Sequence, residues 1–243
     1  MSDILFFALA GFIAQMIDGV LGMGYGVTAT SLLLSLGVPA AVSSASVHTA
    51  EVFSTGFSAF AHLRLKNVLW PLVKKLMVPG IIGAVIGAYI LTSIPGDRIK
   101  PFIAAYLLVM GVIILVKAFR RTVSKKEPPI RTLGLVGGFF DAIGGGGWGP
   151  IVVGSLLAGT DKPRTLIGSV NFAEFFVTLA AAVTFLLTLG VNPWRPILGL
   201  ALGGAIAAPI AARIISRVPA QPLRISVGIF VILLSVRTIW IAL

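Results

Sequence analysis

The chain has 243 residues, of which 57% are hydrophobic and 11% are charged, and its mean hydropathy is +1.04. These values lie far outside the range of soluble globular domains and predict an integral membrane protein. The net charge of +11 does not indicate a nucleic-acid partner, because the basic residues are scattered through short loops without an aromatic-interleaved basic face. The lack of cysteine excludes disulfides, Fe–S clusters and thiolate metal sites.

The chain opens with an apolar segment, residues 3–37, that is interrupted by glycines, and a second segment of this kind covers 132–159. A continuous helix of the first segment's length would measure about 52 Å, too long for one crossing of a bilayer core of about 30 Å. Each segment therefore turns back or breaks at its glycines, either as a re-entrant hairpin or as two short crossings. The remaining apolar blocks predict six membrane-spanning helices, at 40–61, 76–96, 101–119, 163–189, 196–215 and 223–243.

The two halves of the chain are copies of each other. Adding 123 to the numbering lays residues 11–55 on 134–178 without a gap and with thirteen identities. With one inserted residue, "SIPGDRIK" then meets "RVPAQPLR". We predict an N-terminal repeat over 1–121, a cytoplasmic linker over 122–131 with charged residues and a Pro-Pro pair, and a C-terminal repeat over 132–243.

The basic residues predict how the halves lie in the membrane. If each interrupted segment returns to its starting side, the loops on one side hold 15 Lys and Arg and those on the other hold 4; single crossings give 12 and 7. The positive-inside rule favours the first arrangement. The expected fold is an all-α polytopic membrane protein of two inverted repeats, each a glycine-broken segment plus three transmembrane helices, in the cell membrane with both termini outside.

The glycine stretches "GVLGMGYG" and "GGGGWGP" are expected to line a cavity, because irregular backbone at membrane depth is tolerated only inside protein or beside water. A half-helix that starts after such a break presents free N–H groups and a positive dipole end, which favour an anion. Two such breaks predict one anion site near the midplane. The alternative is that the glycines only allow close helix crossing.

The stretches "GFIAQMIDGVLGMGYG" and "GGFFDAIGGGGWGP", each opening one half, resemble the paired glycine signatures of the TauE/SafE sulfite exporter family, also called the 4-toluene sulfonate uptake permease family. The resemblance covers essentially the whole chain. It implies a secondary membrane transporter of sulfite, organosulfonates or related small sulfur-containing anions, working by alternating access.

Ionisable residues inside the predicted membrane segments suggest a functional core. Glu51 and Glu174 lie at equivalent places near the centres of their spans, where a carboxylate is costly and usually faces a cavity or a partner. His48 precedes Glu51 by three residues on the same helical face, as Asn171 precedes Glu174, which predicts proton exchange between His48 and Glu51. The alternative is that each Glu, protonated, ties helices together by hydrogen bonds.

Further candidates also have structural alternatives, which have equal weight for the two aspartates, whereas packing is the default for the aromatic residues. Asp18 and Asp141 precede the breaks and serve either as helix caps or as ligands. The aromatic rings at Tyr25 and Trp148 contact substrate or only pack, and the serines donate to an oxyanion or to their own helix. The predicted substrate-binding residues are Gly22, Gly24, Tyr25, Gly26, Ser46, His48, Gly145, Gly146, Gly147, Trp148, Ser169 and Asn171, and the predicted coupling or polar-core residues are Asp18, Glu51, Asp141 and Glu174.

Two other functional classes stay open at this point. A membrane metallo-enzyme would use His48 and Glu51, but a metal site normally needs a third protein ligand, and His62 is about 21 Å away along the same helix. An ion channel would use the same carboxylates. We expect a transporter rather than an enzyme, with no cofactor, no bound metal and no nucleic acid. Its expected partners are the small anion and the lipid bilayer, and both a coupling proton and a homodimer are compatible with this.

Overall fold

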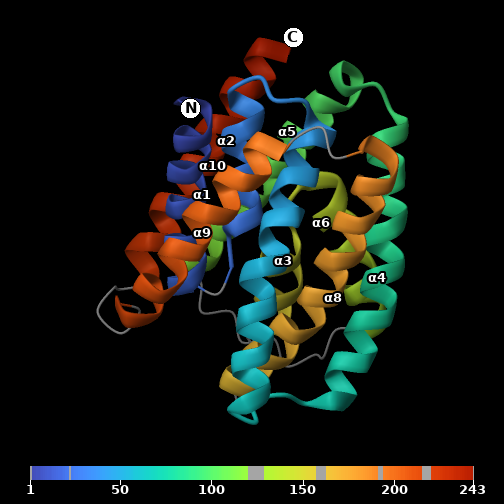
Figure 1. Cartoon of the computed structure of the whole chain (residues 1–243), viewed down its shortest axis with the longest axis vertical. Coiled ribbons are helices and arrows are strands. Elements are labelled where there is room, and N and C mark those ends of the chain that lie inside the picture. Colours follow the sequence, from blue (N-terminus) through green and yellow to red (C-terminus); the bar gives the residue numbers. More distant parts are fainter. Residues whose placement is uncertain are drawn as a thin grey trace.

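The computed structural model describes residues 2–21, 23–119, 129–156, 163–190, 194–214 and 220–242, and this part of the chain is helical throughout, with no strand (Figure 1). The helices are α1 (Ser2–Leu21), α2 (Tyr25–Ser35), α3 (Ala40–Arg64), α4 (Trp70–Ser93), α5 (Gly96–Phe119), α6 (Ile130–Gly144), the π-helix η1 (Gly149–Val153), α7 (Gly154–Leu156), α8 (Pro163–Leu189), α9 (Trp194–Ile214) and α10 (Ala220–Ala242). Gly22 and residues 122–128 of the predicted linker lie outside the described residues.

Both glycine-rich segments are broken where the sequence predicts. In the first half the helix stops at Leu21 and restarts at Tyr25, after Gly24 in a left-handed conformation with φ 121°. In the second half α6 ends at Gly144, and Gly145 turns the chain with φ 66° before a π-helix continues it. Glycine adopts positive φ at no steric cost, so the backbone turns at these positions without strain.

The helices pair across the two halves rather than within them. Helix α1 packs along α9, and α6 packs along α4. Both crossings depend on glycine: a Cβ at Gly11 would lie 2.7 Å from the Cα of Leu200, and one at Gly134 would lie 2.6 Å from the carbonyl oxygen of Leu76. At these two positions glycine therefore allows the helices to cross closely.

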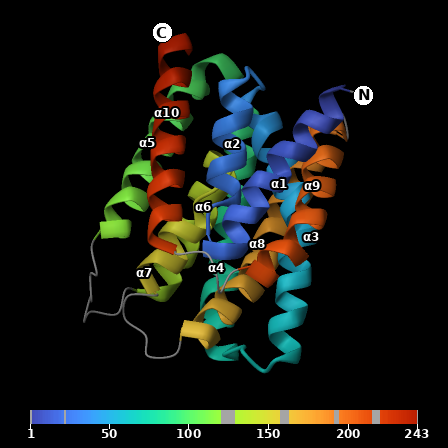
Figure 2. The same ribbon diagram turned by 90° about the vertical axis from the view of Figure 1, so that its left-hand side faces the viewer.

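Two further cross-half pairs join a helix to its own counterpart. Helix α3 lies antiparallel to α8, since Gly56 faces Phe175 while His62 faces Gly168. Helix α5 packs along α10 in the same way (Figure 2). Exchanging the two halves leaves this set of pairings unchanged. In both views α1 begins and α10 ends at the same end of the molecule (Figures 1 and 2).

Four of the described helices are long and apolar enough to cross a membrane: Trp70–Ser93, Gly96–Phe119, Thr165–Leu189 and Gln221–Ile241. Helix α9 has a shorter apolar part, Trp194–Ala207. Helix α3 has 25 residues but carries many buried polar side chains, among them Ser44, His48 and Glu51. The most polar of the predicted spans is thus the one that faces the centre of the protein, and the chain is a multi-pass membrane protein.

Candidate functional site

A small cavity lies where the two glycine breaks meet. Its walls combine residues of both breaks with the side chains of four acidic residues from both halves, namely Asp18, Glu51, Asp141 and Glu174. The cavity volume is about 10 Å³, which is room for about one water molecule. The structure therefore brings together all four acidic residues that the sequence analysis singled out, around a space too small for a sulfur oxyanion, and we call this the closed arrangement.

The two breaks touch each other through their backbones. A Cβ added to Gly26 would lie 2.6 Å both from the carbonyl oxygen of Gly145 and from the Cα of Gly146. One helical turn further along α2, the hydroxyl of Thr30 donates a 2.6 Å hydrogen bond to the same Gly145 carbonyl. Gly26 is therefore needed for this contact as well as for the shape of the cavity.

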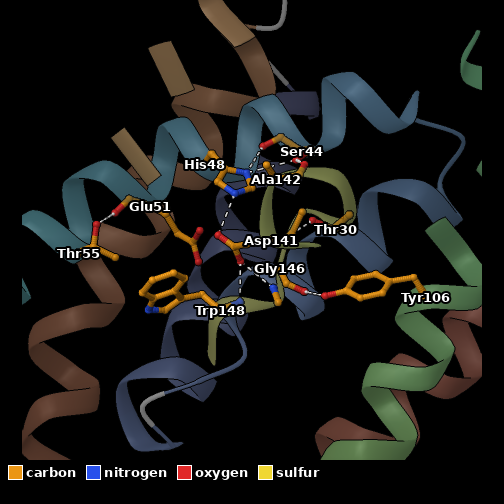
Figure 3. A network of polar contacts seen from close by, with 12 residues as sticks. Thr30, Ser44, His48, Glu51, Thr55, Tyr106, Asp141, Ala142, Gly146 and Trp148 are labelled. Atoms are coloured by element: carbon orange, nitrogen blue, oxygen red, sulfur yellow. Dashed lines mark hydrogen bonds and ion pairs between the residues drawn. The ribbon is translucent and has the colours of Figure 1, made fainter. Parts of the chain in front are cut away.

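Asp141 caps the helix that starts after the second break. One oxygen of its carboxyl group, Oδ1, accepts hydrogen bonds from the amides of Gly147 at 2.7 Å and Trp148 at 2.9 Å (Figure 3). Asp18 has the same relation to the first break, where the amide of Tyr25 donates to its Oδ1 at 3.4 Å. In this structure the two carboxyl groups thus accept from amides that the sequence analysis assigned to a substrate anion, and these contacts are of the kind expected from the capping alternative.

His48 pairs with Asp141 rather than with Glu51. The imidazole is fully buried, and its Nδ1 lies 2.8 Å from the carbonyl oxygen of Ser44, which only accepts, so Nδ1 carries a proton. The other ring nitrogen, Nε2, lies 3.2 Å from Oδ2 of Asp141 (Figure 3). A hydrogen bond at this distance needs one proton between the two groups, carried either by the imidazole or by the carboxyl. His48 itself does not line the cavity.

Glu51 and Glu174 enter the cavity from α3 and α8. Glu51 is buried, and Figure 3 shows its carboxyl group pointing toward Asp141. Glu174 is half-buried and lines the same cavity. Because α3 and α8 are packed counterparts, the two glutamates face one cavity from opposite halves, as the duplicated "AEVF" and "AEFF" stretches predict.

The carbonyl groups around the second break are held by side chains of the first half. Ser44 donates to the carbonyl of Ala142 at 2.6 Å, Tyr106 donates to Gly146 at 3.3 Å, and Lys117 donates to Pro150 at 3.0 Å. The sequence analysis missed these residues and Thr30. The duplication carries no signal for Tyr106 and Lys117, because each lies in an apolar helix without a matching residue in the other half.

The side chains of four other predicted site residues have partners outside the cavity, and none of the four residues lines it. Ser46 donates to Val42 of its own helix, and Ser169 donates to Thr165 while it accepts from the amide of Leu69. Asn171 donates to Ser58 and so joins α8 to α3. Trp148 is fully buried, with its ring packed against Gly80 and Gly137. The contacts of Ser46, Ser169 and Trp148 are of the kind expected from their structural alternatives, and Asn171 makes a hydrogen bond between helices.

The predicted glycines and Tyr25 stay close to the cavity. The cavity is lined by Gly24, Tyr25, Gly26, Gly146 and Gly147. Gly145 is the residue next to Gly146 in the chain. The metallo-enzyme alternative needs His48 as a metal ligand. In this structure both ring nitrogens of His48 already have hydrogen-bond partners. Within the described residues no group of three or more His, Asp or Glu has the spacing to hold a metal ion.

The chain matches the family described as "Sulfite exporter TauE/SafE" over residues 7–238. It is 42% identical to the "Probable membrane transporter protein YtnM" of Bacillus subtilis (strain 168), over all of this chain and 85% of that protein. It is 28% identical to the "Probable membrane transporter protein ORF9" of a Sinorhizobium species, over 77% of this chain and 68% of that protein. No solved structure matches it. The chain belongs to the sulfite exporter TauE/SafE family of membrane transporters.

Proposed function

We propose that this protein is a secondary transporter of small sulfur-containing anions, such as sulfite or an organosulfonate, and that it works by alternating access between two inverted repeats. The observation that carries the proposal is the shared cavity, where both half-helix starts and four carboxyl groups meet. The family membership supports the class of substrate, and the cross-half pairing of helices supports the two-repeat arrangement.

An acidic cavity receives an anion only if its own negative charge is removed. In the closed arrangement the amides of Gly147 and Trp148 are engaged by the carboxyl group of Asp141. A protonated carboxyl group is a weaker acceptor than a carboxylate, so protonation releases these amides for an incoming anion. We therefore assign proton coupling to the site: the proton neutralises the wall and the anion takes the vacated N–H groups.

His48 is the group placed to deliver this proton. It contacts Oδ2 of Asp141 while the amides contact Oδ1, so the same carboxyl group joins the proton site to the anion site. Histidine is also the side chain whose charge ordinarily changes near neutral pH. Glu51 and Glu174, on the opposite wall, repel the anion when ionised and admit it when protonated.

Transport also needs the cavity to open, since about 10 Å³ is too small for a sulfur oxyanion. The glycine crossings of α1 with α9 and of α6 with α4 join each broken segment closely to a long helix of the other half. We propose that each pair moves as one unit and that the cavity opens to one side or the other between the two units.

The acidic wall also favours a second candidate, a proton or cation channel. Concentrative uptake separates the two, because a channel only equilibrates its ion.

Ligand-dependent stability tests the proposal on the purified protein. Sulfite, thiosulfate, sulfoacetate and taurine are compared with acetate and succinate in a thermal-unfolding assay. A ligand at 100 times its Kd adds about 2.7 kcal/mol to the free energy of unfolding. We expect stabilisation by the sulfur-containing anions, larger at pH 6 than at pH 8. The proposal is wrong if none of them stabilises the protein, or if the carboxylates do so equally well.

A further inference from the structure

A second, apolar cavity of about 430 Å³ lies beside the acidic one, between α3, α9 and the start of α2. Ala50, Phe53 and Phe57 of α3 form one wall, and Ala201, Gly204 and Ala205 of α9 form another. Tyr25 lines both cavities, so it lies where the acidic space and the apolar one adjoin.

The equivalent place in the other half is filled. There Gly80, Trp148 and Val177 correspond to Gly204, Tyr25 and Ser54 of the apolar cavity. A Cβ on Gly80 would lie 2.7 Å from Val177 and 2.9 Å from the ring of Trp148, so these three residues are close-packed.

On the hollow side the contacts are loose. A Cβ on Gly204 would first meet the ring of Tyr25, at 3.8 Å. The hydroxyl of Tyr25 has a single long hydrogen bond, 3.4 Å, to the carbonyl of Leu200. The two equivalent sites thus differ by Tyr in place of Trp and Ser in place of Val, and the smaller side chains lie where the apolar cavity adjoins the proposed anion site.

We propose that this cavity binds the apolar part of an organic anion whose charged group lies at the first break. The inference rests on the proposed function, which already includes organosulfonates, and adds the place in this chain that holds their apolar group and selects among them. The amide of Tyr25 lies at the break and its ring forms the wall of the apolar cavity, so one ligand contacts both along this residue. An apolar cavity of about 150 Å³ already binds benzene, so this one accommodates a phenyl group.

The mouth of the cavity faces outward, since the side chains of Phe53 and Phe57 are 57% and 75% exposed. A lipid chain that only fills the cavity is therefore the competing occupant. One measurement distinguishes the two occupants. If the cavity holds the apolar group of the substrate, filling the cavity changes the affinity for anions that carry such a group; if it holds only a lipid chain, the affinity stays the same.

The test compares methanesulfonate with benzenesulfonate by titration calorimetry on the protein in lipid nanodiscs. The filled variant combines Ser54→Val, which copies Val177 of the close-packed half, with Gly204→Ala, which adds a methyl group to the opposite wall of the cavity where there is room for it. Neither residue lines the acidic cavity. Thr49→Val is the matched control, because its hydroxyl also bonds only to its own helix, at Ala45, and it lines neither cavity.

We expect the native protein and the control to bind benzenesulfonate at least about tenfold more tightly than methanesulfonate, as burial of an aromatic ring implies. The filled variant should bind methanesulfonate normally and lose most of the preference. If the native protein binds both equally, or the filled variant keeps the preference, the cavity is not a substrate subsite. If neither sulfonate binds the native protein, the subsite proposal is overturned, whereas the proposed function is decided by sulfite and thiosulfate in the thermal-unfolding assay.

Discussion

At the scale of single residues, Asp141 is the centre of the site. Its two carboxyl oxygens serve different functions: Oδ1 caps the helix after the second break, and Oδ2 meets His48. A substitution of Asp141 that keeps a hydrogen-bond acceptor but removes the negative charge separates its contribution to folding from its contribution to proton coupling.

We expect Asp141→Asn to fold with almost native stability, because its amide oxygen still accepts from Gly147 and Trp148 and its NH₂ group donates to neutral His48. Asp141→Ala should lower the free energy of unfolding by about 2 kcal/mol or more, since it removes the cap and leaves His48 without a partner. Thermal unfolding of both variants measures this. Equal loss of stability in the two would show that the carboxylate charge, not the hydrogen bonding, stabilises the break.

Glu51→Gln gives a second prediction at this scale. Glutamine resembles the protonated carboxyl group in shape and charge, so the variant should bind methanesulfonate more tightly than the native protein at pH 8. At pH 6 the two affinities should converge. Methanesulfonate remains a monoanion over this range, so its own charge does not contribute. Unchanged binding at pH 8 would remove Glu51 from the group of residues that repel the anion.

At the scale of helices, the two breaks form one unit because Gly26 lets them touch. The backbone atoms of Gly145 and Gly146 block any side chain at this position, and backbone does not yield as a flexible side chain does. Gly26→Ala should therefore destabilise the protein by about 1–3 kcal/mol or more. Gly96→Ala, at the first residue of α5 with open space around it, is the control and should be neutral. Equal unfolding temperatures for the two variants would contradict the contact between the breaks.

The helices, the breaks and the convergence of the acidic residues could be predicted from the sequence. The lengths of the apolar segments and the positions of their glycines predict the helices and the breaks. The duplication places Glu51 and Glu174 at matching positions. The partners could not be predicted in the same way. His48 and Asp141 are 93 residues apart, and their contact depends on the packing of α3 against α6. The serines and Asn171 were assigned to the site by pattern alone, whereas their hydroxyl and amide groups bond to nearby backbone and helices.

At the scale of the whole molecule, the two halves are proposed to cross the membrane in opposite directions with both termini outside. The absence of cysteine from the sequence allows single cysteines to report on this without background. Arg98, in the first turn of α5, and Lys66, in the connection between α3 and α4, are both exposed and lie at opposite ends of α4. We expect Arg98→Cys to react with a membrane-impermeant thiol reagent in intact cells, and Lys66→Cys to react only after permeabilisation. The reverse pattern would invert the orientation, and reaction of both would contradict the topology.

The central claim is that a proton and a sulfur-containing anion use the same site, linked through Asp141. Sulfite flux into liposomes that contain the purified protein, with and without an imposed pH gradient, tests it most directly. We expect the native protein to accumulate sulfite beyond equilibrium when the gradient favours proton movement with the anion, and Asp141→Asn to let sulfite only equilibrate. Native flux that does not respond to the gradient, or an Asp141→Asn variant that responds as the native protein does, would contradict the account.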